Sequence, residues 1–253
     1  MGKESKKDEA SGVVGVDIGM KSMVVTSEGV FAGEISDKIR TRVEKSKEKF
    51  ARKQKLNACL KKKGKQPVGL TDKRVESHVR NEAGRAINRM IRSLPANSAV
   101  AVERLNVKDM RFKSREMNRW LRASQLGFIH DRLKFKLDDA GIRYRSVQPA
   151  YSSQQCLACG YVYAGNRADQ AHFCCKKCGF TANADFNASR NLAKRFGDDE
   201  LNKCSFKEVK SILEQRFKAG LPVDRSATAG LELEGKTSQS ALSTQIPMSI
   251  NVY

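Results

Sequence analysis

Four cysteines in two closely spaced pairs are the residues of this chain best suited to bind a metal ion. Cys156 and Cys159 form one C-x-x-C pair, and Cys175 and Cys178 form a second pair after fifteen intervening residues. Each C-x-x-C places two sulfurs on one tight turn, and four thiolates complete a closed tetrahedral site for structural Zn²⁺. The spacing therefore predicts a zinc ribbon, with a redox-active or incidental cysteine cluster as the alternative.

Other potential ligands lie near these pairs. Cys174 adjoins Cys175 and could compete with it, but the C-x-x-C register favours Cys175. Four thiolates already fill a tetrahedral site, so we interpret His172 as a solvated loop residue. Cys59 and Cys204 are interpreted as buried or spare thiols.

Three carboxylates stand at the ends of expected elements and form a second constellation. Asp17 follows the apolar run VVGV, Glu103 ends the run AVAVE, and Asp185 leads a helix expected over 185–196, where it would be the N-cap. Such positions can gather acids from distant sequence at one sheet edge, where hard oxygen ligands bind Mg²⁺ or Mn²⁺. Two ions about 3.5–4 Å apart could then activate water and stabilise a leaving oxygen. Spacing alone also fits solvated turn residues and an ordinary helix cap.

Short apolar runs and helical stripes predict the elements that must position these side chains. Strands are expected at 13–16, 23–26, 30–35, 99–103 and 143–147, with helices over 75–94, 126–140 and 185–196. Gly and Pro within 61–67 separate a polar basic helix from the better-patterned helix that follows. The predicted order is three strands, two helices, a strand, a helix, a strand, the cysteine-rich insert and a last helix.

The charge of the chain points to an anionic partner. It carries 48 Lys and Arg against 28 Asp and Glu, a formal net charge of +20. The segment Lys38–Arg92 holds 19 basic and 5 acidic residues, a net charge of +14. We predict that it contacts nucleic acid with strong salt dependence, a solvated charged face being the alternative. The candidate contact residues are Lys53, Lys55, Lys61, Lys62, Lys63, Lys65 and Arg80.

The sequence favours a cytoplasmic protein with no membrane partner. No apolar run approaches the ~18 residues of a membrane-spanning helix, and Met1–Ala10 lacks the apolar stretch of a signal peptide. The paired C-x-x-C arrangement favours a metal over disulfides.

The sequence around the candidate ligands resembles a known family. The segments GVVGVDIGMKSMVVTSEG, AVAVERLNVKDM and VQPAYSSQQCLACG continuing to FCCKKCGFTANADFNASRNLA are similar to the three RuvC motifs and zinc ribbon of the OrfB/TnpB family. These are transposon-encoded RNA-guided nucleases related to type V CRISPR effectors. The resemblance implies an RNase H-like α/β fold, with a mixed sheet, flanking helices and an inserted zinc ribbon.

The resemblance also implies a mechanism and partners. Asp17, Glu103 and Asp185 would hold two Mg²⁺ ions that cleave DNA phosphodiesters and leave a 3′-hydroxyl, with a guide RNA as second partner. Asn187, Asn191 and Ser153 would support the metal site or the ribbon. Together with the composition of the chain, the resemblance predicts a polar leader over residues 1–12, a RuvC-like domain over 13–150 with a basic helical segment 38–94, a zinc ribbon over 151–182, the last helices of the RuvC-like domain over 183–221 and a loosely ordered tail over 222–253.

One departure from the family shapes the functional hypothesis. Family members carry a wedge and recognition region before the first acidic motif, whereas here residues 1–12 precede it. We therefore expect the catalytic half of an RNA-guided endonuclease, completed by a separate recognition subunit or a second copy. The alternatives are a catalytically idle nucleic-acid-binding regulator or truncated transposon remnant, and a zinc-ribbon protein of the translation or transcription machinery.

Overall fold

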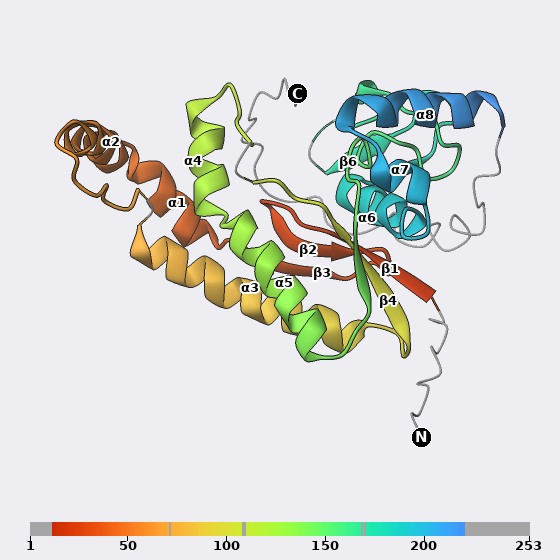
Figure 1. Cartoon of the computed structure of the whole chain (residues 1–253), viewed down its shortest axis with the longest axis horizontal. Helices are drawn as coiled ribbons and strands as arrows, with labels where there is room; N and C mark the ends of the chain where they lie inside the picture. Colours follow the sequence, from red (N-terminus) through yellow and green to blue (C-terminus); the bar gives the residue numbers. More distant parts are fainter. Residues whose placement is uncertain (1–11, 71, 108–109, 168, 170, 221–253) are drawn as a thin grey trace. The chain divides into compact units, whose positions relative to one another are not determined.

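The computed structural model describes residues 12–70, 72–107, 110–167, 169 and 171–220 (Figure 1). The expected tail over 222–253 and all of the expected leader except Gly12 lie outside these ranges. The described chain divides into two compact units. The first unit comprises Gly12, 18–99 and 105–144, and the second comprises 13–17, 100–104 and 145–220.

A five-stranded sheet has the order β3-β2-β1-β4-β5. Its strands are β1 (Gly12–Asp17), β2 (Ser22–Thr26), β3 (Phe31–Glu34), β4 (Ser98–Glu103) and β5 (Tyr144–Val147). β2 and β3 pair antiparallel, with Val24 opposite Ala32, through a turn whose Gly29 has a φ of 79°. A positive φ of this size favours glycine. The predicted α/β fold with a mixed sheet and flanking helices is confirmed.

The described part of the first unit contains five helices, one of which packs on β2 and β3. They are α1 (Asp37–Lys45), α2 (Lys47–Lys62), α3 (Lys73–Ser93), α4 (Arg115–Ala123) and α5 (Leu126–Asp139). The predicted apolar stripe of α3 is buried, with Val79, Ala83 and Met90 each 0% exposed. It contacts β2, β3 and α5, and α3 and α5 lie side by side in Figure 1. Hydrophobic burial thus fixes α3 on the sheet.

The basic helix before α3 is broken into two pieces. Ser46 ends α1 and precedes α2, and its hydroxyl donates a 2.7 Å hydrogen bond to the carbonyl of Val43. α2 buries none of its residues. α4 and α5 are separated by Gln125, whose φ is 53°. Within the described ranges, no helix combines the length and apolar character needed to cross a membrane.

The second unit is built around α6 (Ala184–Lys194), which packs on the sheet through Leu192, Ala101 and Val147. It also contains β6 (His172–Cys174), β7 (Thr181–Asn183), the 3₁₀ turn η1 (Ala164–Asn166), α7 (Asp199–Lys203) and α8 (Phe206–Lys218).

The cap expected for α6 was wrong. Asn183, not Asp185, is the N-cap, and its Oδ1 accepts hydrogen bonds from the backbone N–H groups of Asp185 and Phe186. An Asn side chain meets the need for a short acceptor as well as Asp does. The carboxylate of Asp185 is therefore not used in capping and lies in the first turn.

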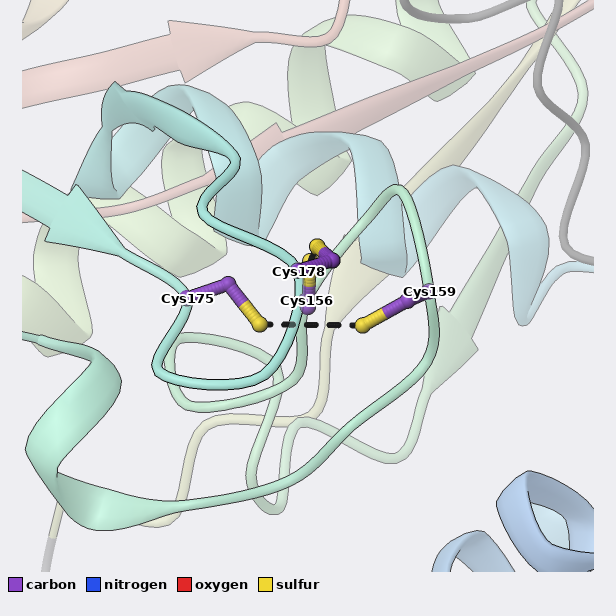
Figure 2. A group of neighbouring side chains, drawn as sticks. All are labelled: Cys156, Cys159, Cys175 and Cys178. Carbon is purple, nitrogen blue, oxygen red and sulfur yellow. Dashed lines mark hydrogen bonds between the residues drawn. The ribbon is translucent and has the colours of Figure 1, made fainter.

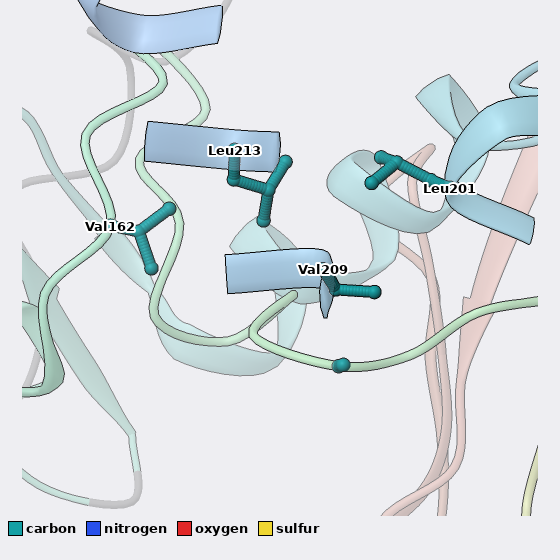
Figure 3. Packing of buried hydrophobic residues seen from close by; sticks show 5 residues of the cluster. Val162, Leu201, Val209 and Leu213 are labelled. Carbon is teal, nitrogen blue, oxygen red and sulfur yellow. The ribbon is translucent and has the colours of Figure 1, made fainter. Parts of the chain in front are cut away.

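A small apolar cluster joins α7 and α8 to the loop of the cysteine-rich segment (Figure 3). Its buried members are Ala150, Val162, Leu201, Val209 and Leu213. α8 begins with a capping box, in which Ser205 and Glu208 bind each other's backbone N–H groups. These contacts give the cysteine-rich segment a fixed support within the second unit.

Candidate functional site

The two C-x-x-C pairs form knuckles of the same backbone geometry. The N–H of Cys156 donates to the carbonyl of Tyr161 at 2.9 Å, and the N–H of Cys175 donates to that of Phe180 at 2.8 Å. The glycine after each pair, Gly160 or Gly179, has a φ of 78° or 75°. Each N–H of these glycines donates back to the first cysteine of its pair. The chain thus folds each pair into one tight turn.

Together the knuckles bring four sulfurs into one group (Figure 2). The ligand atoms of Cys156, Cys159, Cys175 and Cys178 all lie within 4.8 Å of one another. The Cys156–Cys178 and Cys159–Cys175 sulfur distances are 3.7 and 3.6 Å. A tetrahedron with Zn–S bonds of about 2.3 Å has sulfur separations near 3.8 Å, so the group can hold a metal ion with this geometry.

Burial shapes the chemistry of these thiols. It raises the pKa of Cys156 well above its usual range, and it raises the pKa of Cys159 to about 11. A bound divalent cation stabilises thiolates and deprotonates its thiol ligands outright. The donor set therefore fits a soft or borderline cation such as Zn²⁺.

The neighbouring candidates stay outside the sulfur group. It contains Cys175 and not Cys174, as the register predicted. His172 is exposed, and its Nδ1 lies 2.7 Å from Asp169. Cys59 is exposed and Cys204 is partly buried, so neither is a core thiol.

Buried amides attach the ribbon to α6. Asn187 accepts a hydrogen bond from the N–H of Leu157 at 3.1 Å and donates to the carbonyl of Gln155. Asn191 donates to the carbonyls of Gln155 and Ser152. These hydrogen bonds join both side chains to the backbone of the segment 152–157, and the role expected for Ser153 stays a prediction. The first knuckle is thereby fixed on the helix that carries Asp185.

A close backbone approach positions the end of β1 beside α6. A Cβ placed on Gly15 would lie 1.9 Å from the carbonyl oxygen of Ser189 and 2.6 Å from the N–H nitrogen of Ala193. Gly15 therefore lets the strand lie directly on the helix. Side chains alternate along a strand, so Asp17 shares the α6-facing side with Gly15, and Asp185 lies one helical turn before Ser189. The pattern of residues did not reveal this role of Gly15.

The structure couples Asp17 and Asp185 electrostatically. Burial and then the negative charge of Asp185 raise the pKa of Asp17 to about 7, which the guanidinium of Arg167 partly opposes. Like charges held close in a partly buried site disfavour double ionisation, and a cation relieves the repulsion. Both carboxylates fit the donor chemistry of a hard divalent ion.

Glu103 is buried at the end of β4, with 8% of its surface exposed. It lies two residues after Ala101, which packs against Leu192 of α6, so alternation places Glu103 on the same face of the strand. In the described ranges, the four cysteines are the one group of three or more metal-ligating residues with all ligand atoms within 4.8 Å. The three acids thus share one face without forming so tight a group.

Arg167 is a residue that sequence reasoning missed. Its guanidinium lies 3.2 Å from Oδ1 of Asp185, and both side chains are mostly buried. The preceding Asn166 is fully buried: its Nδ2 donates to the carbonyls of Gln154 and Tyr161, and its Oδ1 accepts from the N–H of Lys176. Asn166 therefore joins the two knuckles and fixes the backbone that carries Arg167. One basic residue in a loop gives no sequence signal for this contact.

The predicted basic contacts differ in their surroundings. Exposed lysines include Lys55, Lys61, Lys62, Lys63 and Lys65. Lys53 donates to the carbonyl of Gly69, and Arg80 pairs with Glu76 and lies over the ring of Phe128. Lys53 and Arg80 thus also stabilise the fold of the first unit.

Comparisons with known proteins show similarity to proteins named as DNA endonucleases and to a TnpB-like protein. The family described as "Cas12f1-like, TNB domain" matches residues 127–192. CRISPR-associated endodeoxyribonuclease Cas12f1 of Sulfoacidibacillus thermotolerans is 45% identical over 65 residues, which are 26% of this chain and 15% of that protein. Putative RNA-guided DNA endonuclease InsQ of Escherichia coli is 26% identical over 205 residues, covering 72% of this chain and 48% of InsQ.

A third relative is the TnpB-like protein of Aquifex aeolicus, 38% identical over 82 residues that cover 31% of this chain and 25% of that protein. The matches confirm the resemblance to the OrfB/TnpB family. This chain spans about half the length of InsQ and less of the other two.

Proposed function

We propose that this chain is the catalytic part of a metal-dependent DNA endonuclease that works with a guide RNA. The observation that carries the proposal is the coupled pair of Asp17 and Asp185 beside Arg167, with Glu103 on the same side of the sheet. Relatives whose names describe DNA endonucleases support it.

Asp17, Glu103 and Asp185 would hold Mg²⁺ or Mn²⁺. When bound, two such ions supply an activated water and stabilise the charge on the leaving oxygen. The protein's own contribution is positional: Gly15 allows β1 to lie on α6, and Asn183 rather than Asp185 caps α6. The guanidinium of Arg167, 3.2 Å from Asp185, would add positive charge beside the acidic site, where it could stabilise negative charge on a phosphate.

The ribbon would hold one Zn²⁺ through Cys156, Cys159, Cys175 and Cys178. We assign this ion a structural role, because four thiolates leave no open coordination position. Its contribution to the reaction is indirect, since the ribbon carries Arg167 and is bound to α6 through Asn187 and Asn191.

DNA, a guide RNA and either a recognition subunit or a second copy of the chain are the proposed partners. The net charge of +20 supports binding to polyanions. In this scheme the guide supplies sequence specificity by base pairing, and the acidic site supplies cleavage.

The proposal is tested with purified full-length chain, Mg²⁺ or Mn²⁺, and labelled single-stranded and partly unwound DNA. Asp17→Asn, Glu103→Gln and Asp185→Asn should each abolish cleavage while preserving DNA binding, because the carboxylates would serve as metal ligands. Asp131→Asn is the matched control, since the side chain of Asp131 is 84% exposed. Sequencing of the RNA that copurifies with the chain tests whether it binds a discrete guide RNA.

Cleavage that persists in Asp185→Asn at the wild-type rate would contradict the catalytic assignment. Metal-independent binding with no cleavage by any protein, wild type included, would instead favour the nucleic-acid-binding regulator.

A further inference from the structure

A large basic cavity lies in the first unit and contains none of the acidic site residues. It has a volume of about 1090 Å³ and is bordered by the start of α2, the segment 110–112, α4 and the start of α5. Five of its lining side chains are cationic: Lys47, Arg111, Arg115, Arg119 and Arg122. No Asp or Glu occurs among the described lining residues.

Three of these arginines form a stripe along α4. Arg115, Arg119 and Arg122 are spaced four and three residues apart, which places them on one face of the helix. Across the described ranges, Arg111, Arg115 and Arg119 make no ion pair with a carboxylate. Like charges gathered without compensation oppose folding unless an anion offsets them.

The opposite wall is supplied by one face of α2. Lys47, Phe50, Ala51 and Gln54 line the cavity at helical spacing. Phe50 is covered by the guanidinium of Arg122, which lies 5.1 Å from the ring centroid. This contact holds Arg122 against the wall.

Phe112, another aromatic residue of the lining, has a rigid support. Asn118 accepts a hydrogen bond from the N–H of Phe112 at 2.9 Å and donates to the carbonyls of Phe112 and Ser114. The backbone of Phe112 is thereby clamped to α4, and the partly exposed ring borders the cavity. The cavity therefore combines fixed positive charge with an aromatic surface.

We propose that this cavity binds an unpaired segment of a nucleic-acid strand, with its phosphates at Arg115 and Arg119 and a base against Phe112. The inference deepens the proposed function, on which it rests, by naming a strand-binding site whose proposed phosphate contacts, Arg115 and Arg119, lie outside the basic segment 38–94. Phosphates match the uncompensated arginines, and an aromatic ring stacks on a base only when that base has left its own stack. DNA and RNA share this chemistry, and the experiment separates them.

The test measures binding by fluorescence anisotropy in EDTA, where metal-dependent cleavage cannot occur. The probes are fluorescein-labelled oligo(dT), oligo(U) and a blunt DNA duplex of equal length, each titrated with the full chain at several salt concentrations. The variants are Arg115→Gln combined with Arg119→Gln, and Phe112→Leu, which keeps an apolar side chain while removing the ring. The matched charge control combines Lys203→Gln with Lys207→Gln, two exposed lysines outside the cavity.

The double arginine variant should bind single strands about tenfold more weakly. The slope of the logarithm of its binding constant against the logarithm of the salt concentration should be smaller by about 1.4, since each of two lost phosphate contacts contributes about 0.7 to that slope. Phe112→Leu should weaken single-strand binding at least about fivefold at an unchanged salt slope, because stacking is lost and charge is not. Both should affect duplex binding no more than the lysine control does. Tighter binding of oligo(U) assigns the cavity to RNA, and tighter binding of oligo(dT) assigns it to DNA.

The inference would be overturned if the cavity variants and the lysine control lost the same amount of single-strand affinity. It would also be overturned if the cavity variants lost as much affinity for the duplex as for single strands. Cleavage assays on the same preparations keep the two proposals apart. Wild-type cleavage with unaltered binding in the cavity variants rejects the cavity alone, whereas single-strand binding at the cavity without any cleavage by wild type rejects the nuclease.

Discussion

Gly15→Ala is the substitution that tests most directly how the fold builds the acidic site. The added Cβ would lie 1.9 Å from the carbonyl oxygen of Ser189, where ordinary contact begins at 3.4 Å. β1 and α6 must therefore separate by about 1.5 Å, by the difference of these two distances. Both obstructing atoms, the other being the nitrogen of Ala193, belong to the backbone. No change of side-chain rotamer can relieve the clash.

The expected cost follows from this displacement. Overpacking of a tightly packed site typically costs about 1–3 kcal/mol. For a chain of this size, each kcal/mol lowers Tm by about 2–4 °C, so we expect a decrease of about 2–12 °C. Asp17 lies two residues after Gly15 and moves with β1. A misplacement of about 1 Å at a reacting group can cost about 10²-fold in rate, and cleavage should fall by that order.

The assay compares thermal unfolding and metal-dependent DNA cleavage with those of Gly12→Ala. Gly12 belongs to the same strand, but its added Cβ would meet nothing within 4 Å, so the control should stay near wild type. A Gly15→Ala protein with the control's Tm refutes the direct packing of β1 on α6. If Gly15→Ala lowers Tm but its folded fraction cleaves DNA as fast as wild type, the packing at Gly15 does not set the position of Asp17.

Three further predictions concern the metal sites and their support. Cys156→Ser should lose the bound zinc and unfold the ribbon, whereas Cys174→Ser should keep about one zinc per chain; elemental analysis of both proteins distinguishes ligand from neighbour. Burial and Asp185 raise the pKa of Asp17 to about 7, so the stability that protonated Asp17 contributes below pH ~4 is lost as the pH rises through about 7. In EDTA, Asp17→Asn should therefore have a higher Tm than wild type at pH 8 and nearly the same Tm at pH 4, and an equal Tm at both would contradict the raised pKa. Asn166→Ala leaves buried backbone groups of both knuckles unpaired, so the free energy of unfolding measured in urea should fall by about 2 kcal/mol or more. DNA cleavage should fall as well, because the backbone that carries Arg167 is no longer fixed. An unchanged free energy of unfolding would argue against this role of Asn166.

Some features of the fold followed directly from local patterns. The apolar stripe over 75–94 predicted α3, and the short apolar runs predicted β1 to β5 near their observed positions. The N-cap of α6 was misassigned because Asn183 and Asp185 are both good cap residues, and the backbone geometry decides which one accepts the N–H groups. Competing caps within two residues cannot be ranked from propensity alone.

The sequence alone predicted the four cysteines that the structure brings together, because a C-x-x-C pair places both sulfurs on one turn whatever surrounds it. It also named Asp17, Glu103 and Asp185, through their positions at element ends and the resemblance of their motifs. The tertiary structure was needed to show that Gly15 brings β1 onto α6, that Arg167 contacts Asp185 and that the arginines of α4 line one cavity together with residues of α2. Each of these depends on the packing of segments distant in sequence. Local residue patterns do not specify which backbone or side chain from a distant segment will pack beside a given residue.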